Sequence, residues 1–145
     1  MISPINCIQE TLPFGQHYPW RVMVSCVLLN RTQRNQVRPI LDKVWEMLPT
    51  PDALLHMTDK QENDLHVLLA PLGLINRRYD ILIRMTIDYL EGKELHKCFG
   101  LGKYGRDAVD LFVLGRTDVH PHDTWLKPYL KWRLAGGPPV QWKTK

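Results

Sequence analysis

The sequence predicts an all-α protein. Apolar residues recur at intervals of three and four positions through most of its 145 residues, which is the period of a helix with one buried face. Prolines and glycines divide these stretches into segments of helical length. No segment combines alternating polarity with the turn residues of a hairpin, so the sequence predicts no strand.

The first thirty residues predict two helices. Residues 5–12 carry two isoleucines and a leucine at helical spacing and predict a short first helix. Residues 20–29 (WRVMVSCVLL) are nearly all apolar, and their β-branched residues are compatible with a strand or with a buried helix. Because the rest of the chain predicts helices, we interpret this segment as a buried helix that ends near Asn30.

Three helices are predicted in the segment that follows. Thr32 or Asn35 caps the first of them, since both side chains suit a helix N-terminus. Residues 53–57 form a short second helix, and the third opens at Thr58 and breaks at Pro71. The buried face of the first helix is expected to contain Val37, Ile40, Leu41, Val44, Trp45 and Leu48.

The second half of the chain predicts three more helices. They are expected over residues 76–90, 106–114 and 124–134, and Asp123 is placed to cap the last of them. Residues 135–145 contain two glycines followed by two prolines and predict an irregular tail. The apolar stripe of the first of these helices is expected to consist of Tyr79, Ile83, Ile87 and Leu90.

Composition limits the class of protein. A chain of this length is expected to form a single domain over residues 1–145. Its net charge of +4 permits a phosphate-backbone partner without requiring one. The three cysteines are scattered, too few for an iron–sulfur cluster held by four thiolates, and indicate reduced thiols. No signal peptide or membrane-spanning run stands out, so we expect a soluble intracellular monomer.

A glycine-rich turn lies between two predicted helices, at residues 99–108 (FGLGKYGRDA). Glycine tolerates a positive φ and leaves the N–H groups at the start of the next helix open to an anion. A nucleic-acid phosphate is the anion that we favour. On these ten residues alone, a simple connecting turn explains the glycines equally well.

Six short motifs follow one another along most of the chain. They are CIQET at 7–11, PW at 19–20, LNRT at 29–32, PLGL at 71–74, GLGKYG at 100–105 and VHPHD at 119–123. This pattern resembles the helix–hairpin–helix DNA glycosylase superfamily, and most closely the thymine and uracil mismatch glycosylases that carry a methyl-CpG-binding domain. The resemblance covers residues 7–132. It implies an all-α helix–hairpin–helix glycosylase fold without an iron–sulfur cluster or other cofactor, double-stranded DNA as partner, and a location at DNA in a nucleoid or nucleus.

The resemblance implies that Asp123 is the catalytic aspartate. A fixed carboxylate stabilises the positive charge that develops on the sugar as an N-glycosidic bond breaks, or orients the attacking water. Capping of a helix is the alternative role of Asp123, and the two roles can coexist. Tyr104 stands where relatives such as endonuclease III have a lysine that forms a Schiff base, which a phenol cannot form. The implied enzyme is therefore monofunctional and leaves an abasic site for base excision repair.

Base reading and base flipping are assigned by the same resemblance. Gln9, with Tyr104 lining the same pocket, matches the residue that reads a flipped uracil or thymine through its amide donor and acceptor. Arg31 and Leu74 match residues that enter the base stack and hold the duplex open. Without the resemblance, Gln9 and Arg31 are solvated side chains and Leu74 is a core side chain.

Phosphate contacts are implied around the glycine-rich turn. Its glycines would present backbone N–H groups to the DNA backbone, and its basic residues would add charge. Arg77 and Arg78, which follow Leu74, are further candidates for phosphate contacts. The phosphate-binding residues that the resemblance implies are Gly100, Gly102, Lys103, Gly105 and Arg106.

Several alternatives stay open on the sequence. His120, His122 and Asp123 suit an iron or zinc site, but no further strong ligand stands near them in the sequence, and we expect no metal. The excised base is uracil or thymine, expected opposite guanine, or a modified or damaged pyrimidine. A bifunctional glycosylase–lyase is disfavoured by Tyr104. A helix–hairpin–helix module that binds DNA without catalysis needs neither Asp123 nor Gln9.

Overall fold

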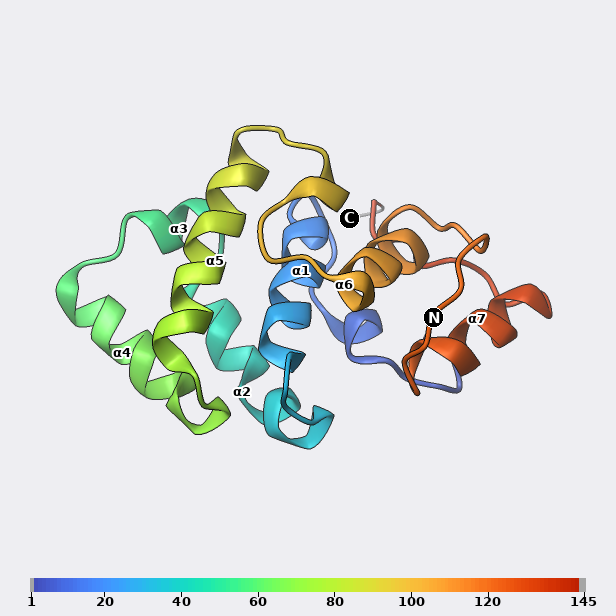
Figure 1. Cartoon of the computed structure of the whole chain (residues 1–145), viewed down its shortest axis with the longest axis horizontal. Helices are drawn as coiled ribbons and strands as arrows, with labels where there is room; N and C mark the ends of the chain where they lie inside the picture. Colours follow the sequence, from blue (N-terminus) through green and yellow to red (C-terminus); the bar gives the residue numbers. More distant parts are fainter. Residues whose placement is uncertain (1, 144–145) are drawn as a thin grey trace. The chain divides into compact units, whose positions relative to one another are not determined.

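The computed structural model describes residues 2–143, and within that range it is helical without any strand, as the sequence predicts. None of the described helices is both long enough and apolar enough to cross a membrane. The α-helices are α1 (Tyr18–Leu29), α2 (Arg34–Met47), α3 (Pro51–Leu55), α4 (Asp59–Leu69), α5 (Ile75–Leu90), α6 (Lys103–Ala108) and α7 (Leu126–Leu134) (Figure 1). Shorter turns are the 3-10 helices η1 (Ile8–Thr11), η2 (Ala70–Leu72) and η3 (Leu95–Lys97), and the π-helical η4 (Val109–Val113).

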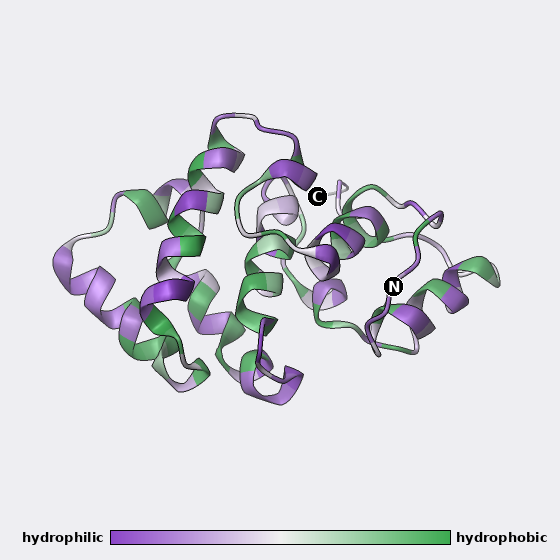
Figure 2. Ribbon diagram, in the orientation of Figure 1, coloured by the Kyte–Doolittle hydropathy of each residue, from purple (hydrophilic) through white to green (hydrophobic). Residues whose placement is uncertain are grey.

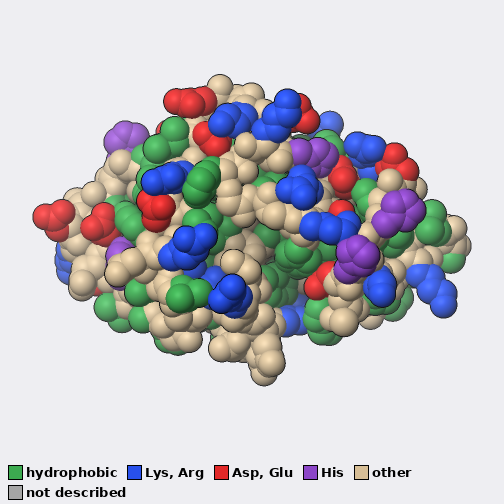
Figure 3. All heavy atoms as spheres, in the orientation of Figure 1, with side chains coloured by type: hydrophobic (Ala, Val, Ile, Leu, Met, Phe, Trp, Pro, Cys, Tyr) green, Lys and Arg blue, Asp and Glu red, His purple; other side chains and the backbone are tan. Residues whose placement is uncertain are grey.

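The chain divides into two compact units. The terminal unit combines the two ends of the chain, Met1–Cys26 and Leu101–Lys145, and the central unit is Val27–Gly100. The boundary between them falls inside α1, after Cys26. The single domain that the length predicts stays a prediction. On the face drawn in Figure 3, acidic and basic side chains are interspersed.

The central unit is built from α2, α3, α4 and α5, with α3 lying against α5 and α2 against α4. The cap of α2 was placed wrongly by the sequence: Gln33 is the N-cap, and its backbone N–H donates to Oε1 of Gln36 at 2.7 Å. Thr32 instead donates its hydroxyl to the carbonyl of Leu28 at 2.6 Å and so closes the end of α1. The helix predicted to open at Thr58 is α4, and Thr58 is its N-cap in a capping box with Gln61.

The buried face of α5 differs from the predicted stripe. Ile87 and Leu90 are each 39% exposed, whereas the buried residues include Arg78 and Thr86 together with Leu82 and Met85. Arg78 and Thr86 are polar, so the true core face of α5 does not look apolar in the sequence. The apolar residues of a neighbouring face follow the helical period more regularly, and the prediction therefore chose that face. The prediction was correct for the existence of α5 and wrong for its orientation.

Most of α1 belongs to the terminal unit, where its residues are largely buried, and Figure 2 colours this helix largely as hydrophobic. The short first helix predicted over residues 5–12 is smaller than expected, because only η1 forms and Asn6 has a positive φ of 55°. The helix predicted over residues 106–114 begins earlier, at Lys103, and continues into η4, all of which is buried. The last helix starts at Leu126.

The tail after α7 is irregular between residues 135 and 143, but it is attached to the terminal unit. Nε1 of Trp142 donates to the carbonyl of Val113 at 2.8 Å, and its backbone carbonyl accepts from Gly15 N at 3.0 Å. The Trp142 ring also stacks on Tyr18, with 5.7 Å between centroids. The aromatic residue therefore closes the terminal unit over α1.

Candidate functional site

Gln9 is the best-defined member of the candidate site. It lies in η1, is only 1% exposed, and its Nε2 donates to the hydroxyl of Tyr104 at 2.9 Å and to Oγ of Ser25 at 3.3 Å. Its backbone carbonyl accepts from the hydroxyl of Tyr18 at 2.8 Å. A solvated glutamine is therefore excluded. The structure brings together two residues that the sequence assigned to one pocket and that stand 95 positions apart.

A buried carboxylate fixes the turn that carries Gln9. Glu10 is 5% exposed and accepts from the backbone N–H of Ser3 at 2.6 Å, the hydroxyl of Ser3 at 2.7 Å and the backbone N–H of Cys7 at 2.7 Å. Hydrogen bonds to a charged group are stronger than those between neutral groups. The backbone around Gln9 is thus held by Glu10 on one side and by the Tyr18 hydroxyl on the other.

Tyr104 lies in the first turn of α6 and is mostly buried. Burial raises the pKa of its phenol far above the usual range, and the nearby Cys26 and Asp123 raise this pKa further, while the hydrogen bond from Gln9 opposes the shift. The phenol therefore keeps its proton. Because Gln9 donates to the phenol oxygen, the hydroxyl hydrogen of Tyr104 is left to point at a ligand.

Asp123 binds the start of α7, but the helix starts two residues later than expected and its N-cap is Trp125, not Asp123 as the sequence predicts. Its Oδ2 accepts from the backbone N–H groups of Trp125 at 2.8 Å and Leu126 at 3.0 Å. Within residues 2–143 its other oxygen, Oδ1, makes no hydrogen bond. The half-buried carboxylate is therefore fixed by one oxygen and open at the other, and its charge reaches Tyr104 and Cys26.

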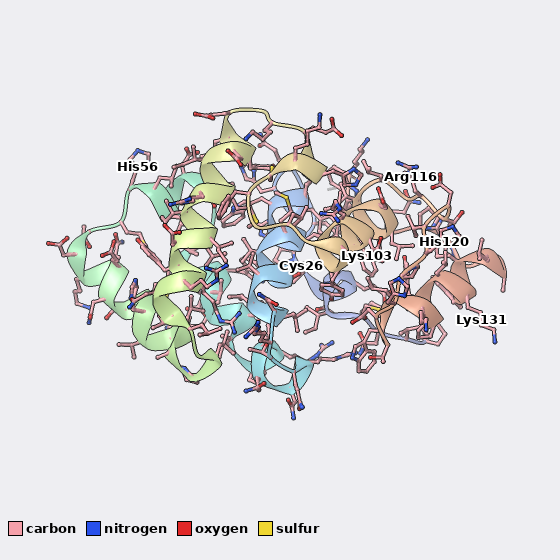
Figure 4. All side chains as sticks on the ribbon, viewed as in Figure 1. Cys26, His56, Lys103, Arg116, His120 and Lys131 are labelled. Atoms are coloured by element: carbon pink, nitrogen blue, oxygen red, sulfur yellow. The ribbon has the colours of Figure 1, made fainter. Side chains whose placement is uncertain are left out.

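Two side chains of α1 join the site without having been predicted. Ser25 accepts from Gln9, and Cys26, shown on α1 in Figure 4, lies with its sulfur 3.9 Å from Gln9 Nε2. Burial raises the pKa of the Cys26 thiol to about 12, with hydrogen bonds from Ser25 and Gln9 opposing the shift. Tyr18, Ser25 and Cys26 are spaced at i, i+7 and i+8, so a helical wheel of residues 18–29 would have placed them on one face.

The glycines of the predicted phosphate turn have different surroundings. Gly100 has a φ of +84°, and a Cβ there would collide with the side chain of Ile81. At Gly105, a Cβ would lie 2.6 Å from Cδ1 of Leu101. Both glycines therefore have a packing reason to be glycine. Gly102, the N-cap of α6, is exposed and meets nothing, so it is open to a ligand.

The basic residues of this turn already have partners within the protein. Nζ of Lys103 lies 3.0 Å from Oδ2 of Asp107, and Nη1 of Arg106 donates to the carbonyl of Leu101 at 2.9 Å. Both side chains sit on the surface of the terminal unit. Their role as phosphate contacts stays a prediction.

Arg31 and Leu74 share an uncommon backbone conformation in the central unit. Their φ angles are 59° and 51°, and within residues 2–143 only one other non-glycine residue, Asn6, has a positive φ. A left-handed conformation costs a non-glycine residue about 1–2 kcal/mol. Leu74 is 54% exposed and Arg31 is exposed as well, so Leu74 is not a core residue. Backbone strain thus coincides with the two positions assigned to the base stack.

Arg78 is not a surface charge, which corrects its prediction as a phosphate contact. It is 3% exposed, and its guanidinium donates to the carbonyls of Gly73, Val27 and Leu72 at 2.9, 2.8 and 3.0 Å. Burial lowers its pKa. Its neighbour Arg77 is exposed.

A separate hollow of about 440 Å³ lies in the terminal unit, between the loop that contains His120 and helix α7. Figure 4 labels two of the residues that line it, His120 and Lys131. The described residues contain no group of three or more His, Cys, Asp or Glu side chains placed to hold a metal ion. The residues that line the hollow are Val119, His120, Pro121, His122, Lys127, Leu130, Lys131 and Leu134.

Comparison with known proteins shows what the chain is similar to. No family model matches the chain. It is 34% identical over 130 residues to a methyl-CpG-binding domain protein 4-like protein of Arabidopsis thaliana. The chain is related to a part of that protein. The aligned region is 88% of this chain but only 28% of the plant protein, so the chain spans little more than a quarter of its relative.

Proposed function

We propose that this chain is a monofunctional DNA glycosylase, which flips uracil or thymine out of a pair with guanine and hydrolyses its bond to the sugar. The observation that carries the proposal is the hydrogen bond of Gln9 to Tyr104, in one buried cluster with Ser25 and Cys26 that the charge of Asp123 reaches. A buried polar cluster of this kind, with one carboxylate oxygen left open, suits a small polar ligand such as a nucleobase.

Gln9 and Tyr104 would read the edge of the flipped base. With Nε2 of Gln9 donating to Tyr104, the amide oxygen of Gln9 is available to accept the N3–H of uracil or thymine. The hydroxyl hydrogen of Tyr104 is available to a carbonyl oxygen of the base. Cytosine has an unprotonated N3 and would leave the Gln9 oxygen without a donor. This pattern selects uracil and thymine without separating them.

Asp123 would act at the sugar. As the N-glycosidic bond lengthens, its electron pair moves to the base nitrogen and positive charge develops on the sugar, which the open carboxylate oxygen stabilises. A water molecule then forms the new bond to C1′ and gives up a proton, and the departing base takes a proton. The two N–H groups bound to Oδ2 hold the carboxylate in a constant direction during this step.

Cleavage by a Schiff base is disfavoured by the local chemistry. The phenol of Tyr104 forms no imine, and the nearby amine of Lys103 pairs with Asp107 at 3.0 Å. Water is therefore the nucleophile that the proposal requires, and the product is an abasic site.

The partner of the proposed enzyme is double-stranded DNA. The relative's name records methyl-CpG binding, which supports DNA as the class of partner for this chain as well. Arg31 and Leu74 would enter the base stack when the base leaves it. The N–H groups at the exposed Gly102, with Lys103 and Arg106, would contact the DNA backbone.

One assay tests the proposal and its alternatives. The protein is incubated with end-labelled duplexes that contain U·G, T·G, hydroxymethyluracil·G or an oxidised pyrimidine, with normal C·G as control, and each sample is divided between alkali and neutral buffer. Strand breaks that need alkali support a monofunctional glycosylase, and the substrate panel identifies its base. Breaks without alkali would indicate a lyase, and a duplex that is bound but left intact would indicate a DNA-binding module.

A further inference from the structure

The guanidinium of Arg78 joins two separate segments of the central unit. Two of its bonds go to the carbonyls of Leu72 and Gly73, in the turn before α5, and the third goes to the carbonyl of Val27, in the last turn of α1. None of the three partners is a carboxylate. The side chain is buried, so its positive charge is balanced by backbone dipoles, including those at the C-terminal end of α1.

These carbonyls stand next to the two strained residues. Gly73 directly precedes Leu74, and Val27 lies four positions before Arg31. The backbone N–H of Arg78 also donates to the carbonyl of Leu74 at 2.8 Å, so Arg78 holds the Leu74 turn through its main chain and its side chain. Leu74 itself is more than half exposed and has little packing of its own to maintain a left-handed backbone.

We propose that Arg78 is a positioning residue that holds Leu74, and the turn carrying Arg31, in the conformations from which both enter the base stack. The proposal rests on the proposed function for the role of Leu74 and Arg31. Arginine is required because its planar fork reaches carbonyls in two segments at once, whereas the single ammonium of lysine has no such reach. Arg78 makes no contact with the DNA in this account and acts through Leu74 and Arg31.

A purely structural role for a buried arginine predicts different behaviour. If Arg78 only stabilised the central unit, its replacement would reduce excision equally on single-stranded and duplex substrates, and the loss would add to that of Leu74→Ala. If it acts through Leu74, the loss is confined to duplexes, where a wedge is needed. The part of the loss that acts through Leu74 also disappears once Leu74 has been truncated, so the double variant loses less than the product of the two single losses.

The first test is a double-mutant cycle with single-turnover excision. R78K is expected to lower the excision rate on a duplex by about 10- to 100-fold, the effect of a reacting group displaced by about 1 Å. The rate on the single strand with the same base should be nearly unchanged, and the loss in R78K/L74A should be smaller than the product of the two single losses. R77K, at the exposed neighbour, is the matched control and should behave as wild type. Equal losses on both substrates, or additive losses on the duplex, would overturn the proposal.

A second test does not depend on activity. Hydrogen exchange by mass spectrometry should show faster exchange in R78K over residues 70–75 and 28–33, with R77K unchanged. Unaltered exchange in both segments would overturn the positioning role of Arg78 even if R78K lowers excision. If the wild type excises no base from any duplex, the proposed function fails, while exchange still decides whether Arg78 holds these turns.

A third variant covers the case in which R78K does not fold. Glycine adopts a positive φ without strain, so in L74G the left-handed backbone at position 74 depends less on the hydrogen bonds of Arg78. R78K should therefore lower the melting temperature less in the L74G background than in the wild-type background, and R78K/L74G should fold where R78K does not. An equal decrease in both backgrounds would contradict a role through Leu74.

Discussion

The two units hold their proposed functional residues in opposite ways. In the terminal unit, Gln9 is 1% exposed and its side chain is bonded to Tyr104 and Ser25. In the central unit, the side chain of Leu74 is 54% exposed. Its backbone is held instead, because Arg78 donates to the carbonyls of Gly73 and Leu74. A group that reads a base must keep a constant direction, whereas a group that wedges a duplex must project beyond the surface.

Because of this difference in burial, substitutions in the two units should affect stability and activity differently. Truncation of a buried, bonded side chain in the terminal unit leaves its partners without hydrogen bonds and so affects folding as well as function. Truncation of the exposed Leu74 removes little packing. The predictions that follow use this contrast, from the largest effect to the smallest.

Asp123→Asn should have the largest effect on activity. Asparagine retains an oxygen that can cap α7, but it lacks the charge that stabilises the sugar cation. We expect the single-turnover excision rate to fall by about 1,000-fold, in the range of general acid–base and charge effects. DNA affinity and melting temperature should be largely retained. Excision close to the wild-type rate would remove Asp123 from the mechanism.

Gln9→Ala should impair both activity and stability. We expect the excision rate to fall by about 100-fold, and the free energy of unfolding to fall by about 1–3 kcal/mol because Tyr104 and Ser25 lose a buried partner. Urea unfolding and single-turnover kinetics measure the two effects. Gln16→Ala, at an exposed glutamine of the same unit, is the control and should change neither. An unaltered unfolding free energy in Q9A would contradict the contrast between the units.

Leu74→Ala should impair activity alone. Excision from a duplex is expected to fall by about tenfold, with no change on a single strand, while the free energy of unfolding stays within about 0.5 kcal/mol of wild type. Val67→Ala, at an exposed position of α4, is the control for loss of an exposed apolar side chain. Equal losses on the two substrates would argue that Leu74 does not act as a wedge.

The smallest predicted effect concerns pH. Burial raises the pKa of Cys26 to about 12, so the folded state keeps the thiol proton while the unfolded chain loses it near pH 8.5. The contribution of Cys26 to stability is therefore complete below the unfolded pKa and is lost as the pH rises toward the folded pKa. Urea unfolding at pH 8 and pH 10 should show this decrease, and a smaller one in C26S. Identical pH dependence in both proteins would contradict the buried environment of Cys26.

Most of the fold could be predicted from the sequence, because helical period and caps are local signals. Thr58 was identified as the start of α4, and α1 was identified from its neighbours despite its strand-like composition, whereas the N-cap of α7 is Trp125 and not the predicted Asp123. The orientation of α5 could not be predicted in this way. Arg78 and Thr86 lie on its core face, and a charged residue is expected at the surface until its three carbonyl partners are known.

The sequence could indicate which residues belong to the candidate site, but it could not indicate how they contact one another. The motifs indicated Gln9, Tyr104 and Asp123, but the bond between Gln9 and Tyr104 joins η1 to α6 across 95 residues, which no local pattern reveals. Ser25 and Cys26 were hidden inside a nearly uniform apolar segment. Close packing against Ile81 and Leu101 gives Gly100 and Gly105 a second reason to be glycine that the sequence did not reveal, and their phosphate contacts stay a prediction.

The most direct measurement of the central claim is the mass of a U·G duplex after incubation with the protein in neutral buffer. The account predicts that the uracil strand remains unbroken and that its mass falls by that of the base less one water, with free uracil released. D123N under the same conditions should leave the mass unchanged. A strand broken without alkali, or an unchanged mass with every pyrimidine duplex tested, would contradict the proposal that Gln9, Tyr104 and Asp123 form a hydrolytic base-excision site.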